Sequence, residues 1–157
     1  MNGFQLVATA DATKLDAISA RAFDPRFGEG WSAGQLAGTL ALSGSWARLA
    51  DGPAGPVGFT LCRRVADEAE LLLVGVDPAW RQRGIAAMLV TAAKNEASRQ
   101  GAKSMFLEVR DGNVAARLLY ERAGFEIVGR RRDYYGGGFG ERFDALTMRI
   151  MLAAASL

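Results

Sequence analysis

The chain has 157 residues, a length that suits one domain over residues 1–157 with a sizeable core. Hydrophobic residues make up 50% and charged residues 23%, with a net charge of +2, as in ordinary globular proteins. Histidine is absent, which excludes Ser-His and Cys-His nucleophilic catalysis and argues against a zinc enzyme, so no metal is expected.

The expected location of the protein is the cytoplasm. Cys62 is the single cysteine, so it permits no intrachain disulfide and agrees with a reducing compartment. No apolar run reaches the length of a membrane span, and the N-terminus has no pattern typical of a secretory signal. We therefore expect no membrane partner.

The N-terminal part of the chain predicts strands and helices in succession. A first strand is expected at residues 4–8, followed by a helix over about 12–23 that Asp24-Pro25 ends. Two further strands, at 46–50 and 57–65, are joined by turn residues.

A second helix is expected before these strands, from Ser32 to about Ser43. Ser32 and Gln35 form a capping-box pattern, and Trp31 and Leu36 stand where a hydrophobic staple requires apolar residues.

The centre of the sequence reads as strand, basic turn and helix. An apolar run from Leu71 to Val76 predicts a central strand over 69–76, which Asp77-Pro78 ends. From Ile85 onward the apolar residues follow a helical period, so a helix is expected over about Gly84 to Arg99.

The turn before this helix has the chemistry of an anion site. A helix start leaves unpaired N–H groups with partial positive charge, and the small residues Gly84 and Ala86 let a ligand approach the backbone. Arg81 and Arg83 add positive charge. The plainer alternative is a packed connection with two solvated arginines. The turn lacks the lysine of a Walker loop and the glycines of a Rossmann turn.

The C-terminal part continues the alternation of strands and helices. Strands are expected at 105–109, 125–131 and 142–152, with a helix at 114–122 and a glycine-rich loop at 134–141. The fold class is therefore α/β, or α+β, with a mixed sheet.

Five segments carry a family resemblance. Arg81-x-x-Gly84-x-Ala86 is similar to the signature of the GCN5-related N-acetyltransferase (GNAT) superfamily, and residues 107–125 resemble its second segment. Gly30-Trp31-Ser32, together with 130–135 and 144–148, resembles a narrower branch, the bacterial ribosomal-protein-alanine N-acetyltransferases.

The resemblance implies a mostly antiparallel sheet flanked by helices and opened by a cleft that holds acetyl-CoA as cosubstrate. The central strand would splay from its neighbour and pair with the pantetheine arm, while the basic turn would hold the pyrophosphate. The cofactor-binding residues implied in this way are Val74, Gly75, Val76, Arg81, Gln82, Arg83, Gly84, Ile85, Ala86, Ala87 and Asn113.

Glu108 is the first catalytic candidate, because a carboxylate in the middle of a strand needs a reason. It could simply pair with an arginine such as Arg110 or Arg117. As a general base it would suit an N-terminal amine, whose pKa of about 7.7–8.0 leaves a fraction neutral at pH 7. The resemblance implies the role of base.

Tyr120 is the second candidate, although it could be an ordinary core aromatic. Its phenol is a donor at neutral pH, and the resemblance implies that it protonates or hydrogen-bonds the leaving CoA sulfur. Trp31, Tyr134 and Tyr135 are candidates for acceptor binding, although such aromatics are more often core residues. Gly136-Gly137-Gly138 departs from the branch and leaves the shape of the acceptor pocket open.

The expected acceptor is the N-terminal α-amine of a protein. One alternative is acetylation of a small-molecule amine or a lysine side chain, and another is a non-catalytic acyl-CoA-binding module. Nucleic-acid binding is disfavoured, because the basic residues are not interleaved with aromatics in any known module.

Overall fold

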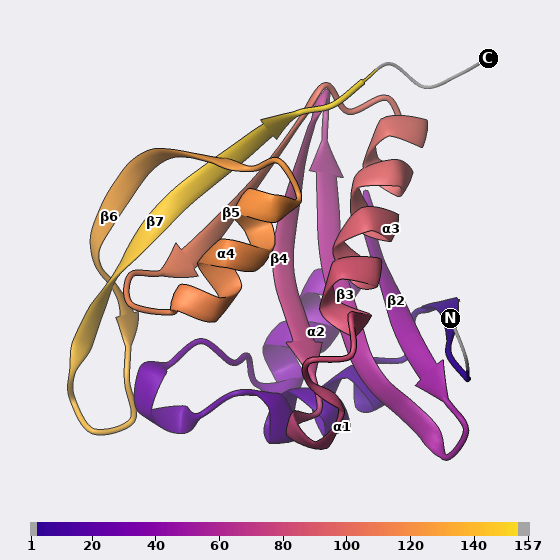
Figure 1. Cartoon of the computed structure of the whole chain (residues 1–157), viewed down its shortest axis with the longest axis horizontal. Coiled ribbons are helices and arrows are strands. Elements are labelled where there is room, and N and C mark those ends of the chain that lie inside the picture. The colour runs from indigo at the N-terminus through magenta and orange to yellow at the C-terminus, as the bar shows by residue number, and fades with distance from the viewer. Residues whose placement is uncertain (1–2, 154–157) are drawn as a thin grey trace.

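A seven-stranded mixed sheet forms the frame of the protein in the computed structural model, which describes residues 3–153 (Figure 1). The spatial order is β1-β2-β3-β4-β5-β7-β6, and β4–β5 is the parallel pair among otherwise antiparallel neighbours. The strands are β1 (Gln5–Thr9), β2 (Ser45–Gly52), β3 (Gly55–Val65), β4 (Glu68–Val76), β5 (Ser104–Arg110), β6 (Glu126–Gly136) and β7 (Arg142–Met151). The α/β class expected from the sequence is confirmed.

Within residues 3–153, four α-helices cover the two faces of the sheet. The helices are α1 (Ala12–Ala22), α2 (Ala33–Leu40), α3 (Ile85–Arg99) and α4 (Val114–Arg122), with 3₁₀ turns η1 (Pro25–Phe27) and η2 (Pro78–Trp80). The apolar side chains of α1 and α2 form one core with β2, β3 and β4, while those of α3 and α4 form another on the opposite face. No helix within residues 3–153 is long and apolar enough to cross a membrane.

A bulge in β4 changes which of its residues face each core. The β3–β4 register shifts so that Leu61 pairs with Leu73 and Cys62 with Leu71, which leaves Leu72 as the extra residue. Side chains normally alternate along a strand, yet Leu71 packs in the core under α3 and Leu73 in the core under α1. After the bulge, the side chains of β4 therefore face the opposite side of the sheet from the one that regular alternation would give them.

The parallel pair β4–β5 holds together over only three residue pairs. Glu68–Glu70 pair with Ser104–Phe106, and beyond them the two strands diverge (Figure 1). The edge of β4 that faces β5 is consequently unpaired from Leu71 to Val76. Gly75 lies on this stretch, where a Cβ atom would come within 2.6 Å of the Phe59 ring. The expected splay of the sheet is thus confirmed.

Most elements differ from the sequence prediction by at most two residues at each end, and two boundaries differ by more. The helix expected to run to Ser43 ends at Leu40. The strand expected to end at Arg131 continues as β6 to Gly136, so Tyr134 and Tyr135 lie in a strand rather than in a loop. Tyr135 of β6 pairs with Phe143 of β7. The register between the two strands shifts between Arg131 and Tyr135.

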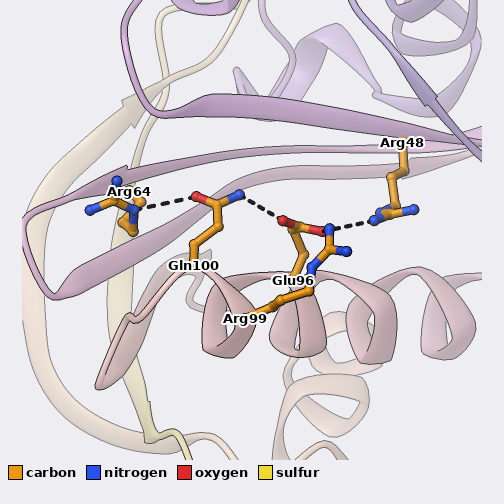
Figure 2. A network of polar contacts seen from close by, with 5 residues as sticks. All are labelled: Arg48, Arg64, Glu96, Arg99 and Gln100. Atoms are coloured by element: carbon orange, nitrogen blue, oxygen red, sulfur yellow. Dashed lines mark hydrogen bonds and ion pairs between the residues drawn. The ribbon is translucent and has the colours of Figure 1, made fainter. Parts of the chain in front are cut away.

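Polar contacts fix the C-terminal end of α3 to the sheet (Figure 2). The Glu96 carboxylate accepts hydrogen bonds from Arg48 of β2 at 3.0 Å, from Gln100 at 2.9 Å and from Arg99. The side-chain oxygen of Gln100 accepts in turn from Arg64 of β3 at 3.3 Å. α3 is one continuous helix from Ile85 to Arg99. Contacts at its C-terminal end therefore also help to position its N-terminal end, which lies beside the gap between β4 and β5.

Candidate active site

The N-terminal end of α3 is open to a ligand. Gly84 is the N-cap residue, with φ +79°, and no side chain caps this end of the helix. A Cβ atom on Gly84 would meet no atom within 4 Å among the described residues. The first N–H groups of α3 therefore face accessible space and give it partial positive charge.

The two arginines of the turn have different surroundings. The Arg81 guanidinium donates to the carbonyl oxygens of Ala22, at 2.6 Å, and Val76, at 3.3 Å, so it ties the turn to α1 and β4. The Arg83 guanidinium lies 4.6 Å from the centre of the Trp80 ring. Arg81 thus has a structural role in addition to its charge.

A cavity of about 660 Å³ lies between the free edge of β4 and the helices α3 and α4. Its lining includes the sequence-predicted cofactor residues Val74, Gly75, Val76, Arg81, Gln82, Gly84, Ile85, Ala86, Ala87 and Asn113. Arg83 is not part of this lining in the described portion of the chain. The structure therefore brings together ten of the eleven predicted residues.

A smaller cavity of about 110 Å³ adjoins the first. Its lining includes both catalytic candidates and all three acceptor candidates, namely Glu108, Tyr120, Trp31, Tyr134 and Tyr135. It also includes Glu29 and Glu70, for which the sequence analysis predicted no role. Burial, followed by the neighbouring charge of Glu108, raises the pKa of the Glu70 carboxyl.

Glu108 lines the smaller cavity from β5, and its strand neighbours Leu107 and Val109 belong to the core under α3 and α4, although Val109 also borders the cavity. One carboxylate oxygen accepts a hydrogen bond from the Thr147 hydroxyl at 2.7 Å. The other lies 3.2 Å from Nε of Arg131. These contacts come from β7 and β6, and they hold the carboxylate in one orientation with its side chain 15% exposed.

The arginines that the sequence suggested as partners of Glu108 bind other carboxylates. Nε of Arg110 donates to Glu29 at 3.0 Å, and Arg117 lies 3.6 Å from Glu121 on α4. Arg110 and Glu108 are two residues apart on β5, but Arg110 contacts the segment after η1, whereas Glu108 contacts β7 and β6. The alternative that Glu108 pairs with an arginine is thus supported, but its partner is Arg131 of β6 rather than Arg110 or Arg117.

Tyr120 lies where the two cavities meet, because it lines both. It is buried, and its ring packs edge-to-face against Phe125, with 6.0 Å between centroids. Burial, with a further contribution from the charge of Glu29, raises the pKa of its phenol. The hydroxyl therefore stays protonated at neutral pH and can donate a hydrogen bond.

Glu29 is the main residue that the sequence analysis missed. It follows η1, and its carboxylate accepts from Nε of Arg110 at 3.0 Å and from Nδ2 of Asn113 at 3.2 Å. Asn113 also accepts from the backbone N–H of Ala116 and so caps α4. The Arg110 guanidinium lies 3.7 Å from the centre of the Phe27 ring. The segment after η1 is thereby fixed to β5 and α4.

The loop between β6 and β7 packs on η1 beside the acceptor candidates. The Gly138 N–H donates to the carbonyl of Pro25 at 2.9 Å, and Arg26 pairs with Glu141 at 3.3 Å. A Cβ atom on Gly137 would overlap the carbonyl oxygen of Arg26. The glycines are therefore needed for close backbone packing, which places the end of β6 beside the smaller cavity.

Comparison with known proteins agrees with this arrangement. Residues 14–125 match the family described as "Acetyltransferase (GNAT) family". The [Ribosomal protein bS18]-alanine N-acetyltransferase of Haemophilus ducreyi is 36% identical over 96 residues, which cover 61% of this chain and 66% of the relative. The matched region thus spans slightly less than two thirds of that relative's length.

Solved structures extend the similarity over nearly the whole chain. The ribosomal-protein-S18-alanine N-acetyltransferase from Escherichia coli superposes with a TM-score of 0.82, at 27% identity, over 97% of both chains. Arabidopsis thaliana NAA60 in complex with a bisubstrate analogue gives a TM-score of 0.77 at 19% identity, over 96% of this chain and all of that one. The second similarity concerns the fold alone.

Proposed function

The chain belongs to the acetyltransferase (GNAT) family, and we propose that it transfers an acetyl group from acetyl-CoA to the N-terminal α-amine of a protein, as an enzyme of the ribosomal-protein-alanine type. The observation that carries this proposal is the meeting of the two cavities. The larger has the size and lining expected for a cosubstrate, and the smaller contains both catalytic candidates. Tyr120 lies at their junction.

The larger cavity fits acetyl-CoA in two respects. The edge of β4 from Leu71 to Val76, which has no strand partner among the described residues, offers N–H and C=O groups to an extended amide-containing arm, as an added strand would use them, although the Val76 carbonyl already accepts from Arg81. The uncapped start of α3, where Gly84 leaves open space, suits a pyrophosphate. When bound, acetyl-CoA supplies the activated acetyl thioester.

The two catalytic candidates then have complementary roles. Glu108 accepts the proton that the amine must lose, directly or through water, since its carboxylate is already oriented by Thr147 and Arg131. Tyr120 donates a hydrogen bond or a proton to the departing sulfur, since its phenol is protonated at neutral pH and lies at the junction of the two cavities. Holding amine and thioester together at the junction supplies much of the remaining acceleration.

Trp31, Tyr134 and Tyr135 bind the first residues of the acceptor in this proposal. Their side chains line the smaller cavity, and the Tyr134 and Tyr135 rings pack edge-to-face with 4.9 Å between centroids. A cavity of about 110 Å³ admits a small N-terminal side chain such as that of alanine. We place the reaction in the cytoplasm, in agreement with the free thiol of Cys62.

The proposal is tested by incubating the protein with acetyl-CoA and a peptide library, followed by mass spectrometry and an assay of released CoA. The library includes peptides with free N-termini, N-terminally blocked peptides that contain lysine, and small amines. Acetylation of free N-termini supports the proposal. Acetylation confined to lysine or small amines would assign the alternative acceptors, and CoA binding without release would indicate a non-catalytic module.

A further inference from the structure

The junction of the two cavities contains one carboxylate, which belongs to Glu29. Six of the described residues line both cavities: Phe23, Glu29, Val74, Asn113, Ala116 and Tyr120. Glu29 is the member of this set with a formal charge. It therefore lies beside the place where an amine from the smaller cavity would meet a thioester from the larger one.

The Glu29 carboxylate is held firmly but is not saturated. Its side chain is 17% exposed, one oxygen accepts from Arg110, and the other accepts from Asn113. A carboxylate offers about four lone-pair positions, so each oxygen can accept a further hydrogen bond. Because the Phe27 ring stacks on Arg110, the ion pair is fixed in position.

We propose that Glu29 anchors the amino group of the acceptor at this junction through a charge-assisted hydrogen bond from the α-ammonium to its carboxylate. This inference rests on the proposed function and names the residue that positions the amine. Arg110 balances most of the charge of Glu29, so the anchored ammonium can still lose its proton near neutral pH.

The proposal divides the work between two carboxylates. Glu108 lies in the smaller cavity with its oxygens engaged by Thr147 and Arg131 from the neighbouring strands. Glu29 reaches the junction from a different segment, the loop between η1 and α2. The charge of Glu29 also acts on the phenol of Tyr120, which is consistent with its position at the reacting end. Glu29 holds the amine, and Glu108 takes its proton.

The test compares two ligands that differ only in the α-amino group. An alanine-initiated peptide and its propionyl counterpart, which lacks that group, are titrated by calorimetry into the protein saturated with CoA. The wild type should bind the free-amine peptide about tenfold more tightly, as expected for a hydrogen bond between charged groups. Glu29→Gln keeps the size and an oxygen for Arg110 but removes the charge, so this preference should disappear.

Matched variants separate anchoring from a structural role. Glu126→Gln makes the same change on the exposed surface of β6 and should keep the full preference. Glu29→Gln should raise the KM of the peptide more than it lowers kcat, measured at saturating acetyl-CoA. The inference would be overturned if Glu29→Gln kept the tenfold preference for the free-amine peptide. It would also be overturned if Glu108→Gln lost this preference while Glu29→Gln kept it.

Two further outcomes are decisive. If Glu29→Gln does not fold, Glu29→Asp keeps a charge for Arg110 but withdraws it by one methylene, so its preference for the free amine must fall. An undiminished preference there would overturn the inference. Failure of the wild type to acetylate any peptide removes the proposed function itself, whereas normal turnover with an unchanged preference in the Glu29 variants removes only the anchoring role.

Discussion

At the residue scale, the site combines a phenol that can donate a proton with a carboxylate that can accept one. Burial raises the pKa of the Tyr120 phenol, which keeps it a donor, while Thr147 and Arg131 hold the Glu108 carboxylate in one orientation. Neither role requires histidine, which the sequence lacks. An α-amine with a pKa of about 7.7–8.0 needs only a modest base at neutral pH.

Glu108→Gln should lower kcat by roughly 10²- to 10⁴-fold at neutral pH, because the amide keeps the size of the side chain but cannot accept the proton. The defect should shrink above pH 9, where the α-amine is already neutral. Parallel pH–rate profiles of variant and wild type measure this. Arg131→Gln removes the same ion pair but leaves the carboxylate, so it should not reproduce the pH-dependent loss. A defect that stays constant from pH 7 to above pH 9 would exclude Glu108 as the base.

Tyr120→Phe should retain the fold, since the ring and its packing on Phe125 remain. Turnover should fall while the Kd of acetyl-CoA stays near the wild-type value, as expected when a transition-state contact is lost. Single-turnover kinetics together with calorimetry separate the two quantities. Wild-type turnover, under conditions where chemistry limits the rate, would remove Tyr120 from the mechanism.

At the element scale, the site depends on two departures from regular pairing. β4 leaves β5 after three residue pairs, and the β6–β7 loop packs directly on η1. The first exposes a strand edge, and the second brings the end of β6 to the smaller cavity. The second depends on glycine, because a Cβ atom on Gly137 would overlap the carbonyl oxygen of Arg26.

Gly137→Ala should therefore destabilise the protein by roughly 1–3 kcal/mol, since its methyl group overlaps the Arg26 carbonyl and forces the loop away from η1. Gly38→Ala is the matched control: a Cβ atom there meets nothing within 4 Å of the described structure, and the residue lies inside α2. It should stabilise the protein by roughly 0.5–1 kcal/mol. Chemical denaturation of both variants measures the difference, and equal stabilities would contradict the proposed packing role of Gly137.

The sequence predicted elements well where the signal was local. The capping box of Ser32 and Gln35 forms as expected, and the helix at 114–122 has the predicted bounds. The prediction of element bounds was wrong where contacts between residues distant in sequence determine the structure. β6 continues through Tyr135 because β7 pairs with it, and no local pattern shows this.

The same distinction applies to the site. The turn at Gly84 and the position of Glu108 are local features, and the structure places both in the cavity walls. Glu29 was missed because its position depends on Arg110, 81 residues away, and Asn113, 84 residues away. A single glutamate among glycines gives no sequence signal of such contacts.

At the scale of the whole molecule, the sheet consists of two parts that a ligand can connect. The meander β1–β4 and the group β5–β7 meet at the short parallel pairing, and α3 leads from one to the other. A ligand in the larger cavity touches β4, α3 and α4 together. Binding should therefore stabilise the folded state as a whole.

Acetyl-CoA at about 100 times its Kd should add about 2.7 kcal/mol to the free energy of unfolding, which corresponds to a rise in Tm of roughly 5–10 °C. Gly84→Glu should lose this shift, because it puts a side chain and a negative charge where the pyrophosphate is expected, at a residue with φ +79°. Differential scanning fluorimetry with and without ligand measures both shifts. If the folded Gly84→Glu variant kept the full ligand-induced rise in Tm, the pyrophosphate would have to bind at another position.

The free edge of β4 also bears on aggregation. An unpaired strand edge is a template on which another chain can add a strand, and sheets usually have such edges at their margins. Here the edge lies inside the sheet, in a wedge that closes where Glu68–Glu70 meet β5 and that α3 and α4 flank. A thin, flexible ligand can enter this wedge, but a strand that belongs to another folded protein cannot. The same geometry that prepares the edge for binding thus protects the protein from intermolecular strand pairing at that edge.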